Sequence, residues 1–286
     1  MFSRSSVRVA VLAVATAMAA SGAVGATALD LYYERALMNA AQDRCGLFTP
    51  TLAAALEAAA DQARGAALRA GASDLAVREA RSQALQRLDG FACDSRDLKI
   101  AADRVRQAFD GWRHVTRMQF PGESAPWTAD RTAYRSARWK LVQDSRAGLT
   151  PVRFGLAGQG DSSVLLAVAA FAPGQRPYAA RLVYRDARRA PAPWLGAPAN
   201  RPLPPRSASA VVLANDEAGA DPNLAPTTHA ASIAFRFPAS AANALAALDP
   251  RERVSVEFIF PGEQVRTAAF EVGDFAAGRA FLRLGG

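Results

Sequence analysis

The chain has 286 residues, 50% of them hydrophobic, and a formal net charge of +8 at pH 7. A basic balance of this kind is found in proteins that bind nucleic acid, anionic lipid or anionic glycan. Lys99 and Lys140 are the only lysines, so arginine carries the charge in an alanine-rich chain. Because a GC-rich genome produces this composition, the charge is weak evidence for any of these partners.

Residues 1–28 have the order of a secretory signal peptide. A basic start precedes an apolar stretch over residues 9–20, and a run of small residues over 21–28 follows. We expect cleavage near Ala26 or Ala28 and a mature chain that is periplasmic or secreted. The alternative is an uncleaved anchor, but a spanning helix needs about 20 strongly apolar residues, and this stretch is mostly alanine.

Export narrows the range of partners. The signal contains Arg4 and Arg8, whose removal lowers the formal charge from +8 to +6. An exported chain has little reason to meet nucleic acid, so we expect none as a partner. A periplasmic protein is the expected partner, and an anionic envelope polymer is the alternative. No second apolar stretch is long enough to span a bilayer, which predicts no transmembrane segment after cleavage.

Cys45 and Cys93 are the only cysteines. In an oxidising compartment such a pair predicts a structural disulfide. Closing a loop of this length stabilises a fold by about 4 kcal/mol on the chain-entropy model. A zinc site lacks ligands, because His114 and His229 are the only histidines. The sequence therefore predicts neither a metal nor a cofactor.

Residues 29–119 predict a helical bundle, because their apolar residues recur at helical spacing. The first helix is expected over residues 30–44, which places Cys45 at its end and Cys93 just before the last helix. A bridge between them would clamp the middle helices onto the outer ones. The expected boundary residues are Thr49 and Pro50 at the start of the second helix, Gly71 at its end, Ser73 or Asp74 before the third, and Asp94 or Ser95 before the last.

A cluster of aromatic and basic residues lies at the end of this bundle. Trp112, Arg113 and His114, together with Arg117, could form a surface on which an anionic or sugar ligand stacks. The helical pattern favours the alternative, in which Trp112 belongs to the core and the basic residues face solvent.

Residues 120–132 break the helical pattern and are predicted to be a linker to a β-rich domain over residues 133–286. In that domain apolar and polar residues alternate, as in an antiparallel sandwich with one buried face per sheet. Short helices are expected over Ser240–Leu248 and Phe275–Leu284. The expected strand segments are 139–141, 152–156, 180–184, 233–237, 254–260 and 266–272.

A proline-rich loop is predicted over residues 187–206, where repeated prolines favour an extended chain. Arg201, Pro202, Pro205 and Arg206 are its candidate contacts for a partner with an aromatic groove. The alternative, which we prefer, is a long surface loop that the prolines stiffen.

About the last fifty residues read as helix, strand, strand and helix, with the segments FPASAANALAALD, VSVEF, AAFEV and DFAAGRAFL. This pattern resembles the C-terminal part of the invasion-associated locus B type of periplasmic β-sandwich. The resemblance implies a non-enzymatic envelope protein, and it assigns no site residue.

The motifs of common hydrolases and nucleotide-binding proteins are absent from the sequence. It contains neither G-x-S-x-G nor a Walker-type loop, and the glycine-rich stretch over 158–163 lies between strands as a hairpin turn. Asp216, Glu217 and Asp221 fall in an expected polar loop over 215–223 without the spacing of a calcium site. We predict no catalytic residue, although two carboxylates from distant positions could still converge.

The sequence predicts an α+β protein with an N-terminal all-α bundle, one disulfide and a mainly antiparallel β-sandwich-like domain with two short helices. The expected function is non-catalytic, namely binding or scaffolding a periplasmic partner through the proline-rich loop or a groove between the two halves. Two alternatives stay open. One is a hydrolase of peptidoglycan or another glycan, and the other is a chaperone-like or inhibitory module for one exported client.

Overall fold

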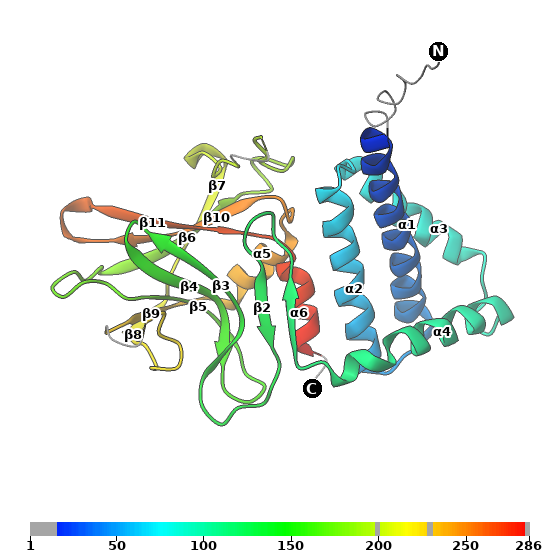
Figure 1. Ribbon diagram of the computed structural model, residues 1–286, viewed down its shortest axis with the longest axis horizontal. Coiled ribbons are helices and arrows are strands. Elements are labelled where there is room, and N and C mark those ends of the chain that lie inside the picture. The colour runs from blue at the N-terminus through cyan, green and yellow to red at the C-terminus, as the bar shows by residue number, and fades with distance from the viewer. Residues whose placement is uncertain (1–15, 198–200, 228–230, 284–286) are drawn as a thin grey trace, which may run out of the picture.

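The computed structural model describes residues 16–197, 201–227 and 231–283, with side chains from Ala28 onward (Figure 1). Long helices lie on one side of the molecule and β-sheets on the other. Helix α6 (Phe275–Leu282) lies between helix α2 (Pro50–Arg69) and the sheets. The predicted α+β fold class is confirmed.

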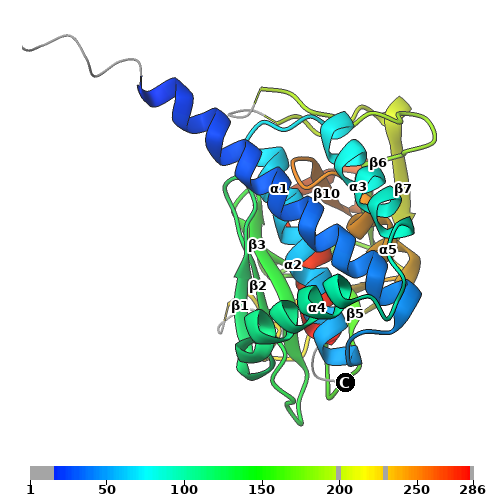
Figure 2. The ribbon, with the colours of Figure 1, turned by 90° about the vertical axis from the view of Figure 1, so that its right-hand side faces the viewer.

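The capping residues of the helical half act as predicted. The Thr49 hydroxyl accepts a hydrogen bond from the backbone N–H of Leu52 at 3.4 Å, and the Ser73 hydroxyl accepts one from Ala76 at 3.0 Å. Gly71 has a φ of +102° and turns the chain after α2. Helix α1 crosses the face of α2, and α4 runs across one end of it (Figure 2). The remaining bounds are α1 (Thr16–Cys45), α3 (Asp74–Asp89) and α4 (Arg96–Phe109).

Two helix boundaries differ from the prediction. Helix α1 extends upstream of residue 30 over the described residues from Thr16, because alanine-rich sequence has high intrinsic helix propensity. The last helix ends at Phe109, and the 3-10 turn η1 (Asp110–His114) follows, since Gly111 disfavours a continued α-helix. No helix in the described ranges combines the length and apolarity that crossing a membrane requires.

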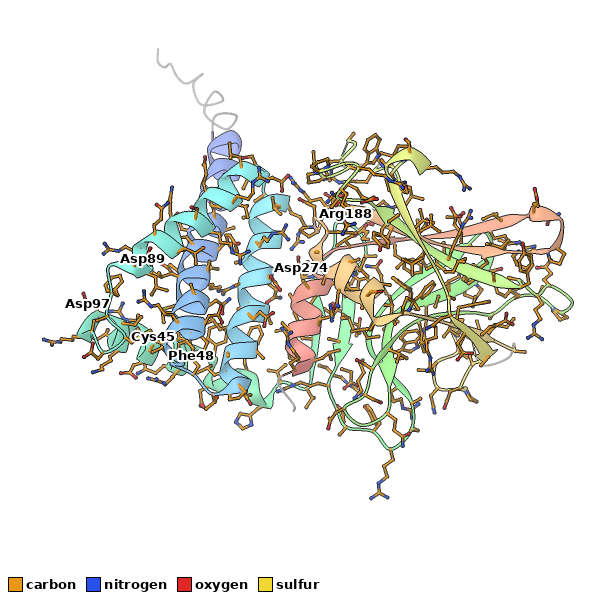
Figure 3. The ribbon with its side chains drawn as sticks, turned by 180° about the vertical axis from the view of Figure 1, so that it is seen from behind. Cys45, Phe48, Asp89, Asp97, Arg188 and Asp274 are labelled. Atoms are coloured by element: carbon orange, nitrogen blue, oxygen red, sulfur yellow. A yellow bond between two sulfur atoms is a disulfide. The ribbon has the colours of Figure 1, made fainter. Side chains whose placement is uncertain are left out.

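The predicted disulfide between Cys45 and Cys93 is present, with Cα atoms 5.6 Å apart. It joins the end of α1 to the segment before α4 across a sequence separation of 48 residues, so α2 and α3 lie inside the closed loop. Figure 3 shows Cys45 beside Phe48 at one end of the bundle. A small apolar cluster surrounds this end: Met38, Ala41, Phe48, Leu56, Leu88, Leu98 and Ala102.

The strands of the described residues form two antiparallel sheets. The seven-stranded sheet has the order β1-β2-β3-β4-β5-β9-β8, and the four-stranded sheet has the order β11-β10-β6-β7. Each expected strand segment lies in one of these strands, although some end a residue early. The bounds are β1 (Arg117–Phe120), β2 (Trp127–Asp130), β3 (Arg138–Ala147), β4 (Thr150–Gly158), β5 (Val164–Ala169), β6 (Ala179–Arg185), β7 (Ser209–Leu213), β8 (Asp216–Gly219), β9 (Ile233–Phe237), β10 (Arg253–Ile259) and β11 (Val265–Glu271).

Two segments without a clear strand pattern nevertheless join the larger sheet. Residues 120–132, expected to be a linker, hold the end of β1 and all of β2, and Phe120 pairs with Trp127 across the hairpin. Part of the expected polar loop over 215–223 is edge strand β8, in which Glu217 pairs with Phe235 of β9. Both strands are four residues long, which is too short for alternation to mark them.

The main core lies between the two sheets, and α5 (Ala239–Ala247) and α6 close one end of it (Figure 1). The Phe154 ring centroid lies 5.0 Å from that of Phe270 and 6.2 Å from that of Trp127. Trp127 also contacts Phe275 of α6 at 4.9 Å. Burying an aromatic side chain of this size stabilises a fold by roughly 1.5–3 kcal/mol. These rings therefore hold α6 onto the sandwich.

A buried ion pair joins the helical half to the sandwich. Arg69 of α2 donates from both terminal nitrogens to the Asp274 carboxylate at 2.8 Å each, and the Asp274 side chain is only 1% exposed. A Cβ on Gly65 would lie 2.0 Å from the Asp274 Oδ1 atom, so glycine permits this approach. Burial raises the pKa of Asp274, and the bonds from Arg69 oppose that rise. Figure 3 shows Asp274 at this boundary.

Helix α2 packs closely against the sandwich. Ala54, Ala55 and Ala58 of α2 belong to the main core, and the cavity between α2 and the sandwich has a volume of about 10 Å³. Arg251 adds a second link, because it pairs with Asp74 of α3 at 3.3 Å and with Asp249 at 3.0 Å. Where α2 meets the sandwich around Asp274, packed side chains therefore leave little space.

Candidate functional site

The structure places the predicted aromatic and basic cluster around η1 and β1. Trp112 is half-buried against the main core, with its ring centroid 5.4 Å from that of Phe109. His114 is exposed, and the Arg113 side chain lies outside the described part of the chain. Arg117 is exposed and donates to Asp130 and to the Tyr134 hydroxyl, each at 2.8 Å. Trp112 thus contributes to packing, and Arg117 is held by an acid of the neighbouring strand.

The proline-rich loop is held on the sandwich by hydrogen bonds. Arg201 pairs with Glu123, and its Nη1 donates to the Gly196 carbonyl at 3.1 Å. The backbone N–H of Trp194 donates to the Glu252 carboxylate at 2.9 Å. Pro202, Pro205 and Arg206 are exposed. A partner could reach these three residues, but Arg201 is already engaged within the chain.

The helical half contains an open groove lined by α1, α2 and α3, with a volume of about 990 Å³. We call it the helical groove. Small alanine side chains make up much of its uncharged lining, together with Tyr32, Leu85 and Leu88. Charged residues of both signs also line the groove: Asp43, Arg44, Glu57, Asp61, Arg81, Asp89 and Arg283. Figure 3 shows Asp89 at the outer side of this region.

Asp61 is the most strongly perturbed acid of the helical groove. Burial, followed by the nearby Glu57 carboxylate, raises the pKa of Asp61 to about 6. Glu57 is one helical turn away on α2 and pairs with Arg283 at 2.5 Å. An acid that lines a groove and whose pKa is raised toward neutral pH is a candidate functional group, because perturbed pKa values cluster at functional sites.

The raised pKa of Asp61 predicts a pH-dependent cost to stability. Its pKa is about 6 in the folded chain against an ordinary 3.8, so the stabilisation present below pH 3.8 is lost as pH rises through 6. We expect Asp61→Asn to gain up to about 3 kcal/mol over the wild type between pH 4 and pH 7, measured by urea unfolding. Asp43→Asn is the matched control, because that carboxyl is exposed on the same groove. Parallel pH curves for Asp61→Asn and the wild type would contradict the assignment.

The other acids considered from sequence are engaged elsewhere. Glu217 pairs with Arg176 at 2.8 Å, and Asp216 lies 3.9 Å from Arg236. Asp221 accepts a hydrogen bond from the backbone N–H of Asn223 at 2.8 Å, as turn residues do. Among the described residues, no three His, Cys, Asp or Glu side chains are grouped as metal ligands would be. His229 lies outside the described ranges.

No known protein family matches this chain, and no match is found among curated proteins or solved structures. The helical groove must therefore be interpreted from its own geometry.

Sequence reasoning did not single out Asp61, although one signal was available. Glu57 and Asp61 are spaced i and i+4 on an otherwise alanine-rich helix, and like charges at that spacing destabilise an isolated helix. A repulsive pair on one face of such a helix marks both acids as candidates for a role in a site. The folded chain was needed to show that α1 and α3 leave this pair at the edge of a groove.

Proposed function

We propose that this chain is an exported, non-catalytic protein of the cell envelope that binds a segment of a periplasmic protein partner in the helical groove. The observation that carries the proposal is Asp61, a carboxyl that lines the helical groove and whose burial raises its pKa to about 6. A partner that brings a basic side chain to Asp61 would favour its ionised form and recover the cost of burying it.

The lining of the helical groove suits an extended or helical peptide segment with charges of both signs. Alanines of α1 and α2 contribute small apolar side chains to the lining, on which small or linear side chains can pack. Arg81 is available to acidic groups of the partner and Asp43 to basic groups. Arg44 and Asp89 already lie 4.0 Å apart as an ion pair. Such charges fix register and orientation more than they add affinity.

Export is compatible with the packing of helix α1. Leu29 and Tyr32 of α1 pack against the cluster formed with α2 and α3. Cleavage after Ala26 or Ala28 would leave both of them in the mature chain. The disulfide between Cys45 and Cys93 fits an oxidising compartment. Mass spectrometry of the mature protein should give Thr27 or Leu29 as its first residue.

Asp61 also supports one alternative, a glycan hydrolase in which it acts as the general acid. A carboxyl with a pKa near 6 is suited to that role. The acid with the largest effect on its pKa is Glu57, which already forms an ion pair with Arg283. We therefore favour binding over catalysis. Release of reducing sugar from peptidoglycan, lost in Asp61→Asn, would reverse this preference.

Site-specific photo-crosslinking in cells tests the binding proposal. A photoreactive residue at Leu85, which lines the helical groove and is 48% exposed, should give one discrete adduct with an exported protein. The matched control is Leu149, which is 93% exposed at the far hairpin turn of the sandwich and should give no such adduct. Asp61→Asn should lower the yield at Leu85. Equal adducts at both positions, or none at Leu85, would overturn the proposal.

A further inference from the structure

A second cavity lies at the end of the sandwich, where the β2–β3 and β4–β5 connections meet the end of α6. It has a volume of about 370 Å³ and is lined by four cationic side chains, Arg131, Lys140, Arg279 and Arg283, against one acid, Asp161. We call it the basic cavity. Leu156 and Leu282 add an apolar wall. Its volume is within the range of small-molecule sites.

Lys140 enters this cavity because of a β-bulge. The register of β3 against β4 shifts between Trp139 and Leu141, so Lys140 points inward although strand alternation would place it in solvent. The residue is only 7% exposed. The ammonium donates to the Gly160 carbonyl at 2.7 Å and to the Thr132 carbonyl at 3.4 Å, and both of these described partners are neutral. A buried cation with neutral partners is costly unless a counter-charge joins it.

Arg279 of α6 also lines the basic cavity, and its described hydrogen-bond partners are neutral as well. Its guanidinium donates to the Ala242 carbonyl at 2.9 Å and to the Asn243 side-chain oxygen at 3.0 Å, again neutral groups. Burial, and then the nearby Arg283, lower the pKa of Arg279, and burial lowers the pKa of Arg131. Arginine stays charged at neutral pH despite such shifts. An anion in the cavity would offset the burial of both guanidinium groups.

Arg131 donates hydrogen bonds to the Val115 and Trp112 carbonyls at 2.5 Å and 3.0 Å. Its guanidinium also lies over the Phe281 ring, 5.2 Å from the centroid. These contacts hold its guanidinium at the wall. Arg283 lines this cavity as well as the helical groove, where Glu57 pairs with it. The charge facing the basic cavity is thus supplied mainly by Lys140 and Arg279, with the other arginines around them.

We infer that the basic cavity binds the oxyanion group of a small ligand, with Lys140 and Arg279 as the residues that contact it. Arginine and lysine are the side chains that recognise phosphate and carboxylate oxygens through charge-assisted hydrogen bonds. Leu156 and Leu282 would pack against the apolar part of the ligand. The oxyanion has two sources, a soluble small molecule or the headgroup of an anionic lipid. The site shares Arg283 with the helical groove, but its contact residues Lys140 and Arg279 do not line that groove.

The presence of only two lysines, Lys99 and Lys140, allows a direct test. In the full mature chain labelled with carbon-13 at the lysine ε position, NMR should show two signals, which Lys99→Met and Lys140→Met assign. Inorganic phosphate, titrated at constant ionic strength, should shift the Lys140 signal saturably and leave the exposed Lys99 signal in place. Acetate tests a carboxylate, and chloride is the control for screening. If both signals move together, or if chloride matches phosphate, the inference is overturned.

Substitutions locate the binding groups. Arg279→Gln should weaken the apparent affinity for phosphate at least tenfold, as should Lys140→Met when binding is followed by calorimetry. Lys99→Met should leave the affinity unchanged. Unfolding curves confirm that each variant is folded. If only one of the two variants folds, its phosphate affinity alone tests the site. Unchanged affinity in a folded variant of Lys140 or Arg279 would overturn the assignment of these residues.

Vesicles distinguish the two sources of the oxyanion. A lipid headgroup as ligand predicts that vesicles with anionic phospholipid, but not neutral vesicles, shift or broaden the Lys140 signal. A soluble ligand predicts a response to free phosphate or acetate alone. Either result supports an oxyanion site, whereas no response to free anions or to vesicles overturns it.

Discussion

Replacing Glu252 with glutamine is expected to lower the free energy of unfolding by about 3–5 kcal/mol, because it leaves a buried charge without its partner. The Glu252 and Arg185 side chains are 2% and 6% exposed and are joined by two bonds of 2.5 and 2.9 Å. Each carboxylate oxygen also accepts a backbone N–H, one from Trp194 and the other from Asp249. Glutamine would turn one oxygen into an NH₂ group, which meets a donor in either orientation.

The large loss of stability in Glu252→Gln should arise because the ion pair is buried. Glu217→Gln breaks an ion pair in which Arg176 is 77% exposed, so we expect it to cost less than about 1 kcal/mol. The double variant Arg185→Met with Glu252→Leu should recover much of the stability, since it removes both charges. Urea unfolding of the mature chain at pH 7 measures all three. A loss below 1 kcal/mol in Glu252→Gln would mean that water reaches the pair.

Local features of this fold were accessible from sequence because they depend on neighbouring residues. The caps of α2 and α3 follow from Thr49 and Ser73, and alternation located the long strands. Where a strand departs from regular geometry, alternation failed. Lys140 was expected in solvent beside Trp139 and Leu141, but the bulge buries it.

Long-range polar contacts could not be predicted from the sequence, because no local pattern identifies which distant residues form a pair. Arg69 and Asp274 are 205 residues apart in sequence, and Arg185 and Glu252 are 67 apart. From sequence, a single arginine or acid in a strand or helix is predicted to lie at the surface, because its ion-pair partner is unknown. The same holds for the candidate sites, since the helical groove and the basic cavity each combine residues from separate elements.

The second large effect is expected at the disulfide. Replacing Cys45 and Cys93 together with alanine should lower the free energy of unfolding by about 4 kcal/mol, because the unfolded chain regains the freedom of a loop with a sequence separation of 48 residues. The bundle has little apolar area with which to offset this loss. The cluster beside the bridge is small and includes two alanines, Ala41 and Ala102.

The loss should fall mainly on the outer helices, because α2 also packs into the sandwich core through Ala54, Ala55 and Ala58. Without the bridge, α3 and α4 keep their contacts with α1 and α2 but lose the covalent link at Cys93. Hydrogen exchange in the double variant should therefore accelerate in α3 and α4 before α2 and the sheets. Reducing the wild type with dithiothreitol is the control, and it should reproduce the change. Uniform acceleration through α2 and the sandwich would show instead that the bridge stabilises the whole chain as one cooperative unit.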